Sequence, residues 1–69
     1  MPLSLSHVGE VGFIKKISGR DEIRQHLADI GFVVGEKVTV ISEIAGNLII
    51  QVKESRVALS RDMASRIMI

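Results

Sequence analysis

The stretch Arg24–Gly35, which reads RQHLADIGFVVG, decides how this chain folds. Ile23, Leu27 and Ile30 stand four and three residues apart, so they share one face of a helix. Gly31 follows the last of them, where a helix favours a residue that tolerates positive φ. The pattern therefore predicts an amphipathic helix that ends at Gly31.

The residues beyond this helix predict how its end is closed. With Gly31 as the first residue past the helix, Leu27 and Phe32 occupy the two positions that touch in a Schellman ending. Gly35 predicts a second bend, and the alternating segment Lys37–Ile44 predicts a strand. We therefore expect a helix, a glycine stop, a short apolar link, a glycine turn and a strand in succession.

Length and composition limit the class of protein. The chain has 69 residues, no cysteine and a net charge of +1. A single domain, residues 1–69, is expected, and a domain of this size buries only about 60% of its unfolded surface. The near-neutral charge argues against a nucleic-acid partner. No apolar run approaches the roughly 18 residues of a membrane span, and no signal-peptide pattern opens the chain. We expect a cytoplasmic protein without direct membrane insertion.

The first third of the chain predicts one strand before the helix. Pro2–Val8 is expected to be an extended lead-in, and Val11–Ile17 a strand with a bulge at Lys15–Lys16 that restores the inward direction of Ile17. Either Ser18 or Asp21 can cap the helix that follows.

The residues after Gly35 predict a first hairpin. A three-residue loop, Ile44–Gly46, places Gly46 in the left-handed position that such a loop needs. A two-residue loop, Ala45–Gly46, would place Val40 opposite Gln51 and turn side chains to the wrong face, so we favour the longer loop. One face of the two strands then points inward: Val38, Val40, Leu48, Ile50 and Val52.

A second hairpin follows, with its turn at Glu54–Ser55. It pairs Lys53 with Arg56 and Val52 with Val57. Neither residue of this turn favours positive φ, so a distorted or longer turn stays open as an alternative.

The end of the chain completes a small β-rich fold. Ser60–Ser65 is expected to form one helical turn, and Ile67 and Ile69 a short last strand. About five short strands with one short helix between the first and second long strands bury their apolar faces best as a small, bent barrel.

The chain resembles the family of ferrous iron transport protein A (FeoA) along nearly its whole length. The residues that carry the resemblance are Arg24, Leu27, Asp29, Ile30, Gly31, Phe32, Gly35, Val38 and Val40, then Leu3, Leu5, Gly9, Ala58, Leu59, Ala64, Ile67 and Ile69. One departure is Glu54–Ser55, where the family commonly has a glycine. The resemblance implies an SH3-like barrel and, as partner, the membrane transporter FeoB with its cytoplasmic GTP-binding domain.

Two sets of exposed residues are candidate sites. Glu22, His26 and Asp29 share a helix face and could hold a transient divalent metal, although a solvated face explains them as well; we expect weak or no iron binding and no resident cofactor. The favoured hairpin registers place a second set on the outer sheet face, as a docking surface for an acidic, partly apolar partner or for a second copy. That set consists of an adjacent apolar pair and a basic row: Ile41, Ile49, Lys37, Lys53 and Arg56.

Three functions are compatible with these features. The first is a non-enzymatic accessory protein of ferrous iron uptake that contacts FeoB. The second is a freestanding relative of the SH3-like C-terminal domain of metal-dependent repressors, and the third is a small nucleic-acid-binding barrel. No nucleophile–base pair or phosphate-binding glycine loop is present, so we do not expect an enzyme. If the outer sheet is not the contact surface, the partner is expected near Arg20, Arg24 and the link Phe32–Val34.

Overall fold

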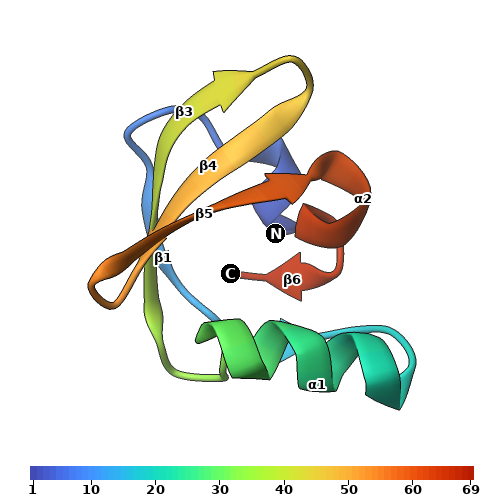
Figure 1. Cartoon of the computed structure of the whole chain (residues 1–69). Helices are drawn as coiled ribbons and strands as arrows, with labels where there is room; N and C mark the ends of the chain where they lie inside the picture. The colour runs from blue at the N-terminus through green and yellow to red at the C-terminus, as the bar shows by residue number, and fades with distance from the viewer.

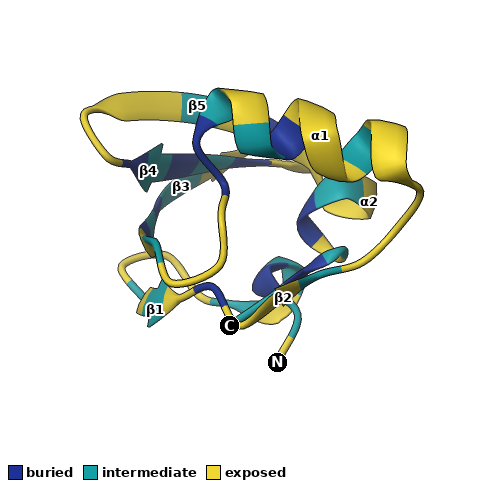
Figure 2. Cartoon of the chain, turned by 90° about the horizontal axis from the view of Figure 1, so that it is seen from below, coloured by how far each residue is buried: buried dark blue, intermediate teal, exposed yellow.

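The computed structural model describes residues 1–69 and contains six strands and one main helix (Figure 1). In chain order the elements are η1 (Leu3–Leu5), β1 (Val11–Phe13), β2 (Lys16–Ile17), α1 (Asp21–Ile30), β3 (Lys37–Ile44), β4 (Asn47–Val52), β5 (Ser55–Ser60), α2 (Arg61–Ala64) and β6 (Ile67–Met68). The larger, antiparallel sheet has the order β1-β3-β4-β5, and β2 pairs with β6 in a second, two-stranded sheet. The main helix α1 lies across the open side of this bent assembly (Figures 1 and 2). The fold is the predicted mainly β, SH3-like barrel.

The end of α1 is closed as predicted. The Gly31 N–H donates to the Ala28 carbonyl at 3.0 Å, and the Phe32 N–H donates to the Leu27 carbonyl at 2.9 Å. These are the two hydrogen bonds of a Schellman ending. Leu27 and Phe32 are both fully buried, so the glycine that stops the helix also delivers two side chains to the core.

The start of α1 differs from both alternatives for its cap. Arg20 occupies the cap position, and no side-chain hydrogen bond is made there. Asp21 is the first helical residue, and its carboxylate forms an ion pair with Arg24 instead of capping. Neither Ser18 nor Asp21 is therefore the N-cap.

The predicted single strand Val11–Ile17 is wrong, because the chain changes sheets within it. Residues up to Phe13 pair with β3, whereas Lys16 and Ile17 pair with β6. Ile14 lies at this corner and is 2% exposed. A corner, not a bulge, breaks the apolar alternation. The lead-in Pro2–Val8 is also not fully extended, since η1 forms within it and buries Leu3.

The first hairpin keeps the predicted register only in its lower half. Val38 pairs with Val52 and Val40 with Ile50, as expected. Beyond Val40 the register shifts by one residue at a bulge, and the turn is the two-residue Ala45–Gly46 instead of the predicted three-residue loop Ile44–Gly46. Both turn residues have positive φ, 50° and 82°, as a type I′ hairpin turn requires. Because the bulge adds one residue to β3, Val40 pairs with Ile50 and not with Gln51, even though the turn has two residues.

The second hairpin turns one residue earlier than predicted. Lys53–Glu54 forms the turn, Val52 pairs with Ser55, and Ile50 pairs with Val57. Lys53 adopts φ 53°, a conformation that suits glycine. The predicted turn at Glu54–Ser55 is therefore wrong by one position.

The core contains every residue that the hairpin pattern turned inward. Helices, strands and links all contribute to it: Leu3, Ile14, Leu27, Phe32, Val38, Val40, Leu48, Ile50, Val52, Leu59, Ala64 and Ile67. No helix has the combined length and apolar character needed to cross a membrane.

Candidate docking surface

The outer face of the larger sheet carries the apolar part of the predicted site. Ile41 and Ile49 are both half-buried. They are not opposite each other, because the bulge leaves Ile41 unpaired and places Ser42 opposite Ile49. Ala58 on β5 is the other neighbour of Ile49. The predicted adjacent isoleucine pair is therefore wrong in geometry, although both residues lie on β3 and β4 as expected.

The three basic residues surround Gln51 instead of forming a row. Lys37 and Lys53 line one shallow hollow of about 240 Å³, together with Glu36, Thr39 and Gln51. Arg56 lies opposite Gln51 and donates from Nε to its Oε1 at 3.1 Å. The predicted row assumed Lys53 opposite Arg56, which the earlier turn removes.

These three cations are exposed and unpaired. None of Lys37, Lys53 and Arg56 takes part in an ion pair, and all three are exposed. Glu36 is the one carboxylate that lines the hollow between the two lysines. Glu54 lies beside Lys53 in the turn, so this end of the sheet carries three cations and two carboxylates.

Two exposed apolar residues on β1 extend this face, and the sequence reasoning missed them. Phe13 pairs with Lys37, and Val11 pairs with Thr39. Paired residues share a face, so both side chains lie on the outer side. Phe13 is 60% exposed and Val11 50% exposed. The alternation of Val11 and Phe13 with Gly12 was the signal that could have found them.

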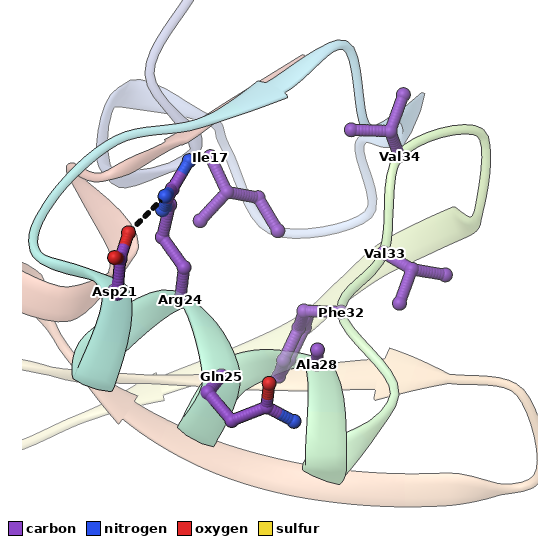
Figure 3. Close-up of a pocket in the computed structure, with 8 residues that line it drawn as sticks. All are labelled: Ile17, Asp21, Arg24, Gln25, Ala28, Phe32, Val33 and Val34. Carbon is purple, nitrogen blue, oxygen red and sulfur yellow. Dashed lines mark hydrogen bonds and ion pairs between the residues drawn. The ribbon is translucent and has the colours of Figure 1, made fainter.

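A second surface feature is a groove beside α1 (Figure 3). It has a volume of about 650 Å³ and is lined by Ile17, Asp21, Arg24, Gln25, Ala28, Phe32, Val33 and Val34. The Asp21–Arg24 ion pair lies at one end, so the charged groups here neutralise each other. Val34 is 67% exposed. The groove coincides with the helix-side contact region that the sequence offered as an alternative.

The predicted metal face does not assemble into a ligand group. Glu22, His26 and Asp29 are exposed on α1, and Asp29 accepts a hydrogen bond from Gln25 Nε2 at 2.9 Å. No three His, Asp or Glu side chains of this structure lie together as a metal centre requires. A shared helix face alone leaves the three groups pointing into solvent without converging.

A small bent barrel with one covering helix and shallow, open surfaces defines the class: an SH3-like domain. The FeoA domain model matches residues 1–69. A candidate Fe(2+) transport protein A of Methanocaldococcus jannaschii is 35% identical, over 99% of this chain and 83% of the relative. This chain belongs to the FeoA family.

Solved structures agree with this assignment. A crystal structure of an iron uptake regulatory protein (FeoA) is 32% identical with a TM-score of 0.88, over 96% of this chain and 88% of that one. The zinc-complexed FeoA of Stenotrophomonas maltophilia, described as a procaryotic SH3 domain protein, is 27% identical with a TM-score of 0.86, over 99% and 87%. A manganese-dependent transcriptional repressor shares the fold, at 23% identity and a TM-score of 0.87, over 97% of this chain but 39% of the repressor.

Proposed function

We propose that this protein is a non-enzymatic accessory protein of ferrous iron transport that works by binding the cytoplasmic, GTPase-containing part of a FeoB-type transporter. Membership of the FeoA family supports the process. One structural observation supports the mode of action: exposed Phe13 lies opposite Lys37, on the sheet face that also carries Arg56 opposite Gln51. Lys37, Lys53 and Arg56 have no ion-pair partner. The proposal includes a cytoplasmic location and no resident cofactor.

The apolar part of this surface would supply most of the affinity. Complete burial of a phenylalanine side chain stabilises a complex by about 1.5–3 kcal/mol, and Phe13 still has 60% of its surface to bury. Ile49 lies on the same outer face but is already half-buried, so it contributes less. Phe13 is therefore the expected centre of the contact.

The cations would set the rate and the orientation of binding. Lys37 lies opposite Phe13, and Lys53 and Arg56 lie around Gln51. If Phe13 is the centre of the contact, these charges lie toward its rim, where charges act mainly on the association rate. Exposed rim charges are screened by salt over about 8 Å at physiological ionic strength. The partner surface that fits is consequently acidic around an apolar centre.

The test is a titration of the partner's soluble cytoplasmic part with variants of this chain. Phe13→Ser is expected to weaken binding about five- to twentyfold, as the burial of the exposed part of Phe13 implies. It should leave the thermal melt nearly unchanged, because it creates no buried cavity. Ile44→Ser is the matched control, since Ile44 is 61% exposed at the far end of β3. Reversal of charge in Lys53→Glu with Arg56→Glu should slow association and flatten its salt dependence.

Normal binding of the Phe13→Ser variant would show that Phe13 is not at the centre of the contact surface. If Val34→Ser then weakens binding, the contact lies in the groove beside α1. If the wild-type protein itself does not bind, the proposed partner is wrong.

A further inference from the structure

Lys53 occupies a position that costs the fold stability in two ways. It holds φ 53° in the turn between β4 and β5, a left-handed conformation that suits glycine and is unfavourable for a residue with a side chain. It also follows the Val38–Val52 pair, and the same register places it across from Lys37. Like charges opposite each other on neighbouring strands repel. Residues that are held at such a cost are concentrated at functional sites.

The two lysines line the same shallow hollow, whose lining is entirely polar. The hollow has a volume of about 240 Å³, and no hydrophobic residue lines it. A water molecule takes up about 30 Å³ in the liquid, so there is room for one small hydrated ion. Neither ammonium group has an ion-pair partner, and Thr39 adds a hydroxyl that can donate. The hollow therefore suits a small ligand that accepts hydrogen bonds.

Gln51 fixes the cations of this region relative to one another. Its Nε2 donates to the Lys53 carbonyl at 3.1 Å, and its Oε1 accepts from Arg56 Nε at 3.1 Å. One side chain thus connects the turn that carries Lys53 with the guanidinium of Arg56. Arg56 makes no ion pair, so its terminal nitrogens remain available to a ligand. The arrangement is built before any ligand arrives.

The charges around the hollow decide the class of ligand. Glu36 is the one acidic residue that lines it, and Glu54 follows Lys53 in the turn without lining it. A single exposed ion pair contributes little free energy, so a monovalent carboxylate would gain little here. A phosphate group carries about −1.5 to −2 charges at pH 7 and has enough oxygens to contact several cations at once. A phosphate is therefore the better match.

We propose that this hollow binds a phosphate group. Lys37 and Lys53 hold it as point charges, the Thr39 hydroxyl donates to it, and Arg56 lies beside it. The bound anion removes the repulsion between the two lysines. This binding needs no transporter, so it goes beyond the proposed function, although it neutralises cations that the proposed docking surface also uses.

A titration of the whole chain with inorganic phosphate tests the site. Amide NMR spectra are recorded at constant ionic strength, with phosphate replacing chloride. Saturable shifts are expected at the residues in and beside the hollow, with a dissociation constant in the millimolar range. Those residues are Lys37, Thr39, Gln51, Lys53 and Arg56.

Variants of Lys53 separate binding from stability. Lys53→Gln should weaken phosphate binding about two- to fivefold, as the loss of one exposed charge pair implies. Lys53→Gly should weaken binding by the same factor while it raises the melting temperature, so the loss of binding cannot come from unfolding. Lys16→Gln is the matched control, because it removes the same charge from an exposed position in the other sheet. Glu36→Gln should tighten binding.

Gln51→Ala distinguishes a built site from a diffuse positive field. It changes no charge, but it releases Arg56 and the turn that carries Lys53. Phosphate binding should therefore weaken about twofold or more, as the loss of the two hydrogen bonds implies. Thermal melts by circular dichroism check that this variant is folded.

Two further ligands identify the source of the phosphate. A nucleoside diphosphate that binds more tightly than inorganic phosphate, and loses affinity in Lys53→Gln, would assign the site to nucleotides. Phosphatidylcholine vesicles with phosphatidic acid that bind the wild-type chain but not Lys53→Gln would assign it to a lipid headgroup. Binding of inorganic phosphate alone would assign it to the free ion.

Three results would overturn the proposal. The first is phosphate-induced shifts that do not saturate, and the second is acetate that binds as tightly as phosphate. The third is a Lys16→Gln variant that loses as much affinity as Lys53→Gln. No measurement contains the transporter, so a failure here leaves the proposed contact through Phe13 untouched.

Discussion

Replacement of Gly31 by alanine tests whether the end of α1 depends on a backbone conformation that glycine adopts readily. Gly31 has φ 124° and ψ 1°, outside the regions open to other residues. A Cβ atom added there would lie 3.7 Å and 3.8 Å from the methyl carbons of Val52, which is ordinary contact. The cost therefore comes from the backbone and not from a clash. We expect a loss of about 1–3 kcal/mol in the free energy of unfolding.

The same magnitude follows if the backbone relaxes. A return of residue 31 to negative φ would break the hydrogen bonds from the Gly31 and Phe32 N–H groups to Ala28 and Leu27. Two such bonds contribute about 1–3 kcal/mol in total. For a domain of this size, each kcal/mol shifts the melting temperature by about 4–8 °C. Thermal denaturation should therefore show Tm lowered by roughly 5–20 °C.

A series at this position separates the backbone effect from other causes. Gly31→Asn should lose less than Gly31→Ala, because asparagine tolerates positive φ better. Gly31→Val should lose most, since a β-branched residue is least tolerated there. Glu22→Ala, an exposed change in the same helix, serves as the control. An alanine variant that melts within about 2 °C of the wild type, or an asparagine variant no better than alanine, would refute the reasoning.

Two further substitutions probe the sheet. A Cβ added to Gly12 would meet Ile69 Cδ1 at 2.8 Å, so Gly12→Ala should destabilise the protein by about 1–3 kcal/mol through overpacking. In a double-mutant cycle measured by chemical denaturation, Ile69→Ala should cost less free energy of unfolding in the Gly12→Ala background than in the wild type. Strict additivity of the two changes would exclude the contact. Lys53 holds φ 53° in the second turn, so Lys53→Gly should raise the free energy of unfolding by about 0.5–1 kcal/mol through relief of left-handed strain. The same change should slow association with the transporter fragment, and a lower melting temperature would show that the turn is not strained.

Local sequence determined the end of α1, and its prediction held in detail. Leu27, Gly31 and Phe32 lie within six residues, so their geometry depends on one glycine and on helical spacing alone. The start of the helix offered no comparable constraint. Ser18 and Asp21 are both good capping residues, yet Arg20 occupies the cap without a side-chain bond. Cap preferences amount to about 1 kcal/mol, which tertiary packing can override.

The bulge at Ile41 could not be derived from pattern. Type I′ geometry at Ala45–Gly46 and inward packing of Val40 require different registers, and the structure satisfies both by one extra residue on β3. The extra residue also places Glu43 opposite the buried Leu48. There Glu43 forms an ion pair with Arg61, which donates to the Ser4 carbonyl at 3.0 Å. That contact joins segments that are distant in sequence, so no local sequence pattern could predict it.

The candidate surface shows why the sheet face on which a side chain lies was easier to predict than the residues that lie next to it. A two-residue change in pairing leaves every side chain on its original face, and the second hairpin differs from its prediction by such a change: Ile50 pairs with Val57 instead of Leu59. Leu59 stayed inward and Arg56 stayed outward, but Lys53 moved into the turn and Arg56 came to lie against Gln51. A binding surface depends on which residues lie next to each other as well as on the side of the sheet that they occupy. Ile49 and Arg56 therefore lie on the predicted outer side of the sheet, whereas the grouping of the candidate residues, and the exposure of Phe13 opposite Lys37, needed the structure.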